Sequence, residues 1–256
     1  MSLLSDTWYL FVRAIKKLIR TPILLFFSLF QPIIFLVLFT QLFTKFSSVP
    51  GFPAGSYLLF ATPGILLQNA FSSALQSGTS IVDDLNSGFL QKMLVTPVSR
   101  SAILLGRLVS DAFRVVVQSV IILILAYALG FSEVTGFEGI LLSLSLIAFF
   151  GLAWSGISLT IGLTTRSAEA VFGIGGFLTF PLLFMSTALV PAKGFMPDWM
   201  VMVSNYNPIS YTVNAVRDLA LTGFTWGDIV SATLVISGIA IVTLAATLYK
   251  FKKVVS

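Results

Sequence analysis

Charged residues are rare in this chain, and three of them recur at helical spacing within one apolar run. Arg107, Asp111 and Arg114, followed by Gln118, are separated by four, three and four residues, so they share one face of a helix. A charge in an apolar helix is costly unless it is paired, and Asp111 lies within reach of both arginines. The spacing predicts an ion-pair ladder between helices, and a moving charge relay is the alternative.

A second group of polar side chains lies in the apolar stretch 57–79. Gln68, Asn69, Ser72 and Gln76 crowd its later half. Hydrocarbon offers amide groups no hydrogen-bond partners, so these side chains must meet protein or water. Two interpretations stay open: the residues line a transport path, or they form hydrogen bonds between packed helices.

The only dense polar stretch between apolar runs on its side of the chain is VDDLNSGFLQKMLVTPVSRS, residues 82–101. Asp83 and Asp84 are expected to start a short helix, and Pro97 is expected to end it. One side of that helix would carry three apolar residues at i, i+4 and i+8: Leu85, Phe89 and Met93. Such a helix can dock a partner protein or rest on a membrane, and the pattern alone favours neither.

Most catalytic chemistry is excluded by what the sequence lacks. It contains no cysteine and no histidine, which rules out disulfides, thiol nucleophiles, Cys/His metal sites and imidazole acid–base steps. The phosphate-binding pattern GxxxxGK[ST] is absent, as are HExxH and GxSxG. We therefore expect a chain that is not an enzyme and binds neither a metal nor a cofactor of its own.

The composition is that of a membrane protein. Hydrophobic residues make up 57% and charged residues only 10% of the chain, with a mean hydropathy of +0.99. A membrane-crossing helix needs roughly 20 apolar residues. We predict an all-α, polytopic fold in which residues 1–256 form a single transmembrane domain with six spans: 23–43, 57–79, 108–129, 139–162, 170–191 and 229–249.

The distribution of positive charge predicts how these spans are oriented. With six spans, both termini lie on one side, and that side holds eleven Lys or Arg residues against three on the other. The positive-inside rule then places the N- and C-termini in the cytoplasm. Nucleic-acid binding is not indicated, because the basic residues flank spans and form no patch with interleaved aromatics.

Two segments outside the spans are expected to lie at membrane surfaces. Residues 4–20 alternate an aromatic and aliphatic stripe with a basic one, which predicts an amphipathic helix in contact with membrane lipid. Residues 192–228 are apolar but are broken by prolines, so they predict short helices that dip into or lie on the outer leaflet.

The chain resembles the membrane subunits of type-2 ABC exporters, in particular the daunorubicin-resistance-type permeases. Three features carry the likeness: the basic helix that leads into the first span, the run DDLNSGFLQKMLVTPVSRSAILLGRLVSD at 83–111, and the stretch FPLLFMSTALVPAKGFMPDWMVMVSNYNPISYTVNAVRDL at 180–219. Thr187 departs from the glycine that many members have there.

The resemblance implies partners and roles. It implies a second permease copy, identical or paralogous, and a separate cytoplasmic ABC ATPase that binds ATP and magnesium. It also implies contact with that ATPase through Asp83, Asp84, Leu85, Phe89, Lys92, Pro97 and Arg100. An external gate or lid is implied at Pro191, Pro197, Trp199, Asn207, Pro208 and Arg217.

The function expected from this likeness is an ATP-driven export permease in the plasma membrane for a hydrophobic or amphiphilic molecule, such as a drug or a lipid. One alternative is a permease for polysaccharides or lipo-oligosaccharides. The other is a secondary transporter or channel that works without an ATPase. That alternative would need ionisable residues at mid-membrane, whereas Asp111 and Arg114 lie close to one end of their span.

Overall fold

The computed structural model describes residues 3–20, 22–95 and 100–255, and every regular element among them is helical. The elements are α1 (Leu3–Arg20), α2 (Pro22–Leu42), the 3₁₀ helix η1 (Thr44–Ser48), α3 (Tyr57–Asn86), α4 (Phe89–Leu94), α5 (Arg100–Ala128), α6 (Gly136–Thr165), α7 (Ala168–Phe184), α8 (Asp198–Tyr206), α9 (Pro208–Leu221) and α10 (Trp226–Val255). The predicted all-α fold is confirmed.

Helix α3 forms the centre of the bundle and packs against α2, α5, α6, α7 and α9. Its backbone approaches α6 closely because glycines replace side chains at the contact. A Cβ built on Gly78 would lie 2.6 Å from the carbonyl oxygen of Ser158, and one on Gly162 would lie 2.6 Å from the carbonyl oxygen of Gly78. Small residues allow this approach in apolar bundles, where van der Waals packing holds helices together. The hydroxyl of Ser158 adds a hydrogen bond to the Ala74 carbonyl.

Within the described residues, four helices are long and apolar enough to cross a membrane: α3, α5 from Ala102, α6 and α10. The apolar stretches Phe26–Leu42 in α2 and Ala168–Phe184, which is α7, are shorter. All six helices overlap the spans expected from the sequence. The molecule is therefore a helical membrane protein with four long apolar helices and two shorter ones.

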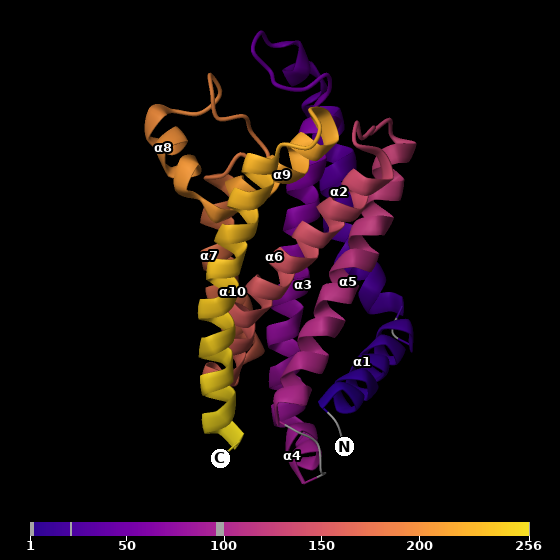
Figure 1. Cartoon of the computed structure of the whole chain (residues 1–256), viewed down its shortest axis with the longest axis vertical. Helices are drawn as coiled ribbons and strands as arrows, with labels where there is room; N and C mark the ends of the chain where they lie inside the picture. Colours follow the sequence, from indigo (N-terminus) through magenta and orange to yellow (C-terminus); the bar gives the residue numbers. More distant parts are fainter. Residues whose placement is uncertain (1–2, 21, 96–99, 256) are drawn as a thin grey trace.

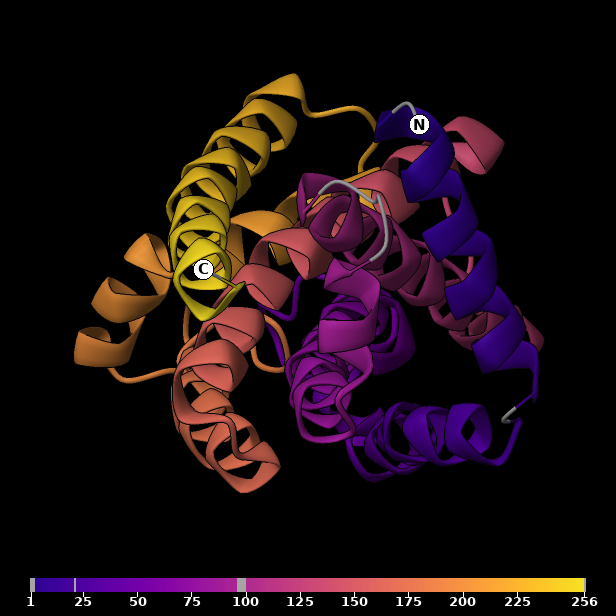
Figure 2. The same cartoon turned by 90° about the horizontal axis from the view of Figure 1, so that it is seen from below.

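The helix ends are sorted between the two ends of the bundle. The start of α1, the short helix α4 and the C-terminal end of α10 lie at one end, and α8 and α9 lie at the other (Figure 1). Viewed from below, α1 crosses the flank of the bundle opposite α10 (Figure 2). It packs chiefly on α5. We refer to the end with α4 as the α4 end and to the opposite one as the α9 end.

The helix predicted to start at Asp83 does not start there. Both aspartates belong to the last turns of α3, which continues to Asn86. The break falls at Gly88, whose φ of +68° suits a residue without a Cβ, and α4 follows from Phe89. Leu85 therefore lies on a different helix from Phe89 and does not share a stripe with it. A helix does not have to end where its apolar stretch ends, and that is why the prediction was wrong.

The predicted span 170–191 was also too long, because α7 ends at Phe184. The chain then runs without regular helix until α8 begins at Asp198. Irregular backbone in an apolar bundle has to find hydrogen-bond partners inside the protein. The partners come from α9 and its N-cap, described below with the residues at the α9 end.

Candidate functional site

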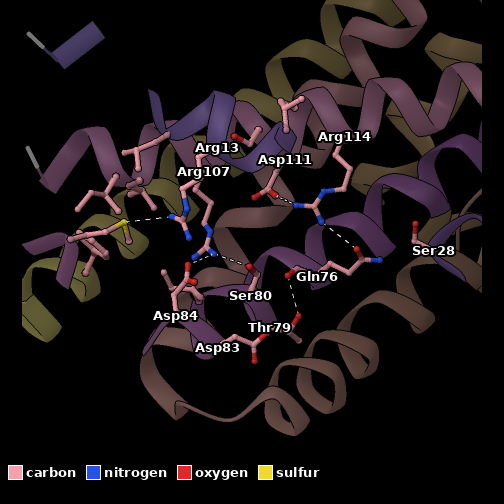
Figure 3. Close-up of a pocket in the computed structure, with 18 of the residues that line it drawn as sticks. Arg13, Ser28, Gln76, Thr79, Ser80, Asp83, Asp84, Arg107, Asp111 and Arg114 are labelled. Atoms are coloured by element: carbon pink, nitrogen blue, oxygen red, sulfur yellow. Dashed lines mark hydrogen bonds and ion pairs between the residues drawn. The ribbon is translucent and has the colours of Figure 1, made fainter. Parts of the chain in front are cut away.

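A cavity of about 530 Å³ opens at the α4 end, bounded mainly by α1, α2, α3 and α5. Its wall is mixed. Apolar side chains such as Leu10, Ile15 and Phe27 line part of it. The rest carries six charged side chains: Arg13, Asp83, Asp84, Arg107, Asp111 and Arg114 (Figure 3). We call this the charged cavity.

Arg107 joins α5 to the end of α3. Its Nη2 donates to Asp84 Oδ2 at 2.8 Å and to the Ser80 hydroxyl at 2.9 Å. Both charged side chains are only partly exposed, at 16% and 15%, so the pair is less screened than a surface pair. The ladder expected from spacing placed Arg107 against Asp111. In the structure Arg107 points toward α3 instead. Its partner Asp84 lies on the last turns of α3, beyond the predicted end of the span at residue 79.

Asp111 pairs with the other arginine of the expected ladder. Its carboxylate accepts hydrogen bonds from Arg114 and from the Ser77 hydroxyl of α3. Arg114 also donates from Nη1 to Gln76 Oε1 at 3.2 Å. The carboxylate is nearly buried, and a buried charge needs such a set of partners. Asp111 and Arg114 thus form a cross-link between α3 and α5 on the cavity wall (Figure 3).

Arg13 brings α1 to the same wall and contacts α4. Its guanidinium carbon lies 3.8 Å from the centre of the Phe89 ring, and Nη1 lies 3.9 Å from the Met93 sulfur. Among the described residues, no carboxylate lies within ion-pair distance of Arg13. Arg13 therefore connects α1 with α4, two helices that are far apart in sequence.

The polar group on α3 is divided by the structure. Gln76 and Ser72 are partly buried, and Gln76 lines the charged cavity. Gln68 and Asn69 are buried deeper in the bundle at 4% and 1% exposure. Both polar atoms of the Asn69 side chain, and Oε1 of Gln68, have no hydrogen-bond partner within the described part of the protein. Of the four residues, Gln76 lines the charged cavity.

The residues expected to contact an ATPase gather around α4 and the end of α3. Asp83 and Lys92 are exposed, and Leu85 packs with the apolar cluster below the cavity. Phe89 lies under Arg13 as described. Pro97 falls outside the described residues. Arg100 begins α5, and its side chain is likewise outside them.

A second polar centre lies at the α9 end and is formed by three of the residues expected in the external gate, Asn207, Pro208 and Arg217. Arg217 of α9 is buried at 6% exposure, and its guanidinium lies 3.8 Å from the centre of the Phe60 ring. It donates to three backbone carbonyls, those of Phe60 at 3.1 Å, Thr187 at 2.6 Å and Ala188 at 3.3 Å. Arg217 therefore supplies hydrogen-bond donors to the irregular chain that follows α7.

Asn207, at the junction of α8 and α9, also donates hydrogen bonds to the end of α7 and the chain that follows it. Its amide nitrogen donates to the carbonyls of Leu182 at 2.7 Å and Met185 at 3.1 Å, while its oxygen caps α9 at Ile209 N. Pro208 occupies the first turn of α9, where a missing N–H costs nothing. One Asn-Pro pair thus ends α7, caps α9 and fixes the chain between them.

The other residues expected in an external gate do not converge on this centre. Pro191 is buried in the irregular chain. Pro197 precedes α8, and Trp199 on α8 is 56% exposed. Helix α8 stands away from the bundle (Figure 1), and Ser204 is its one buried residue. The sequence pattern of this proline-broken stretch does not indicate which of its prolines and aromatic residues point inward. The single arginine of that stretch, at position 217, was the signal for the buried centre.

Comparison with known proteins agrees with this architecture. Residues 5–221 match the ABC-2 type transporter family. The daunorubicin resistance ABC transporter permease protein DrrB1 of Streptomyces coeruleorubidus is 31% identical over 81% of this chain and 72% of its own length. A putative transport permease, ycf38, of Cyanophora paradoxa is 32% identical over 84% and 74%. The probable doxorubicin resistance permease DrrC of Mycobacterium tuberculosis is 25% identical over 90% and 82%.

The chain belongs to the ABC-2 type transporter family. It is a permease, the membrane subunit of an ABC exporter.

Proposed function

We propose that this permease exports a hydrophobic or amphiphilic molecule, drug-like or lipid, across the cell membrane. The names of two relatives, which are daunorubicin and doxorubicin resistance permeases, support that class of cargo. In this proposal all six apolar helices cross the membrane, α1 lies on the inner surface, and both termini are cytoplasmic. Helices α8 and α9 form the external re-entrant segment.

The observation that carries the proposal is the position and surface of α4. Leu90 anchors it in the apolar cluster below the cavity, at 1% exposure. Lys92 and Val95 face outward, and Val95 is 86% exposed. A short helix held at one end of the bundle with an exposed mixed surface suits docking of a soluble protein. That protein is a cytoplasmic ABC ATPase, which carries the ATP and magnesium.

The remaining partner is a second permease copy, identical or paralogous. The cargo would then move along a path that neither copy forms alone. Closure of two ATPases would push on α4, and the contacts from α4 to α1 and from α3 to α5 would carry that displacement to the helices. Arg107 and Arg114 are the side chains that make the second set of contacts.

Co-purification with the ATPase tests this proposal. The full chain is expressed with a candidate ABC ATPase from the same organism, and ATP hydrolysis is measured with candidate lipids and drug-like compounds. We expect Phe89→Glu to lower both the recovered ATPase and the stimulated hydrolysis. Phe137→Glu is the matched control, since Phe137 is 78% exposed at the start of α6 near the α9 end. Equal recovery and hydrolysis in both variants would reject α4 as the docking helix.

A further inference from the structure

The charged cavity is richer in hydrogen-bond donors than the protein itself uses. A guanidinium carries five N–H donors in a planar fork. Arg107 uses Nη2 for Ser80 and Asp84, and Arg114 uses Nη2 and Nη1 for Asp111 and Gln76. Among the described residues, the Arg13 guanidinium contacts only the Met93 sulfur and the Phe89 ring. Several donors on three converging arginines therefore remain for a ligand.

The chemistry that matches such a wall is a phosphate group. Its oxygens accept several hydrogen bonds at once, and guanidinium groups bind phosphate with two parallel bonds. The apolar part of the same cavity, with Leu10, Ile15 and Phe27, suits a hydrocarbon chain that leaves the phosphate. A volume of about 530 Å³ is within the range of ligand sites.

In the orientation proposed above, with α1 on the inner membrane surface, the cavity lies at the depth of lipid headgroups. Its outer wall is the amphipathic helix α1, on which Trp8 and Tyr9 are 61% and 68% exposed. Aromatic side chains of this kind gather at the membrane interface. An opening beside such a helix meets headgroups rather than acyl chains or bulk water.

We propose that the charged cavity binds an anionic phospholipid, with the phosphate on Arg13 and Arg107 and an acyl chain along the apolar wall. The site rests on the orientation proposed above, but its occupation by lipid does not require transport or an ATPase. Asp83 is the carboxylate that opposes this binding. It lines the cavity, is exposed, and has no ion-pair partner among the described residues.

Native mass spectrometry of the purified full chain in detergent tests the site, with phosphatidylglycerol as the probe. We expect Arg13→Gln to weaken binding of the first lipid about tenfold, the equivalent of one charged hydrogen bond. Asp83→Asn should strengthen it by removing repulsion. Lys16→Gln is the matched control, because Lys16 is an exposed cation on α1 that does not line the cavity. The affinity of the Lys16→Gln variant for the first lipid should lie within about twofold of the wild-type affinity.

Three results would overturn the proposal. Equal losses in Arg13→Gln and Lys16→Gln would show general attraction to a basic surface. Phosphatidylcholine binding as tightly as phosphatidylglycerol would show that negative charge is not recognised. Displacement of the lipid by millimolar inorganic phosphate would assign the wall to a free anion. The binding assay contains neither ATP nor the ATPase. Failure of the transport proposal would therefore not change the outcome of the lipid-binding test.

Discussion

The guanidinium carbon of Arg13 lies 3.8 Å from the centre of the Phe89 ring, so α1 and α4 are joined by one cation–π contact. Helices α2, η1 and α3 lie between the two residues in the sequence, and Arg13 lines the charged cavity. A displacement of α4 would therefore move the helix that forms the outer wall of the cavity. The contact gives the α4 end a mechanical link that does not pass through α3.

Weakening this link should affect coupling more than stability. A cation–π contact at an exposed site contributes about 0.5–1 kcal/mol, so Phe89→Leu should lower the free energy of unfolding by no more than about 1 kcal/mol. We expect a larger drop in cargo-stimulated ATP hydrolysis by the complex with the ATPase. Phe89→Tyr keeps the aromatic face and should behave as wild type. A Phe89→Leu complex with full stimulation would show that the contact transmits nothing.

Arg217 should be the most sensitive position at the α9 end. Replacing it with Met leaves the carbonyls of Phe60, Thr187 and Ala188 without their donor. Breaking a buried charged network of this kind costs about 3–5 kcal/mol. Thermal unfolding in detergent measures the loss. Lys193→Met removes an exposed cation from the chain after α7 and should change the unfolding temperature little. Equal stability of the two variants would contradict the assigned role of Arg217.

Substitution of Asn69 distinguishes the two interpretations of the polar group on α3, which are a transport path and hydrogen-bonded helix packing. Its amide is 1% exposed and has no partner within the described residues. An unpaired buried polar group costs about 1–3 kcal/mol, so Asn69→Leu should stabilise the fold by a similar amount. If the amide serves a hydrated path, transport falls in the same variant.

The control for Asn69 is Thr62→Val on the same helix, which removes a hydroxyl that is already bonded to the Leu58 carbonyl. Thr62→Val should cost about 0.5–1.5 kcal/mol. Loss of stability in Asn69→Leu together with unchanged transport would favour helix packing and remove Asn69 from the path.

Glu133, between α5 and α6, should make stability depend on pH. Burial raises the pKa of its carboxyl to about 7, and hydrogen bonds from Thr135 and Ser143 oppose that rise. The folded protein then holds this proton at pH values where the unfolded chain has lost it. Stability is therefore greatest below the ordinary glutamate pKa of about 4.3 and falls as pH rises toward 7.

Glu133→Gln should remove that part of the pH dependence. The difference from wild type should reach about 1 kcal/mol at pH 8, allowing for solvent screening of a half-buried group. Thermal unfolding of both proteins between pH 5 and pH 8 measures it. Parallel curves across that range would show that the Glu133 carboxyl ionises as it does in the unfolded chain.

Hydropathy predicted where helices run, but not where each one ends. Each of the six apolar stretches overlaps a helix, because a backbone surrounded by lipid or apolar side chains must satisfy its own hydrogen bonds. The ends depend on single residues. Helix α3 runs past its predicted end and stops just before Gly88. Helix α7 stops before its predicted end, and Asn207 binds the carbonyl groups at that point. Neither helix end can be recognised from the hydropathy of the sequence.

The candidate site was partly predictable for a similar reason. Spacing along one helix places residues on a face, so Arg107, Asp111 and Arg114 could be grouped in advance. Which partner each one takes depends on a second helix. Arg107 pairs with Asp84 only because α3 extends past its apolar part. Arg13 and Phe89 are 76 positions apart in the sequence. No local sequence pattern predicts a contact between them.

The side of the membrane that α4 occupies is the central claim, and labelling of single cysteines tests it most directly. The chain has no cysteine, so Lys92→Cys and Phe137→Cys each carry one thiol. A membrane-impermeant maleimide is added to intact cells and, separately, to permeabilised cells. We expect Phe137→Cys to be labelled in both and Lys92→Cys only after permeabilisation. Labelling of Lys92→Cys in intact cells would place α4 outside, where no ATPase can reach it.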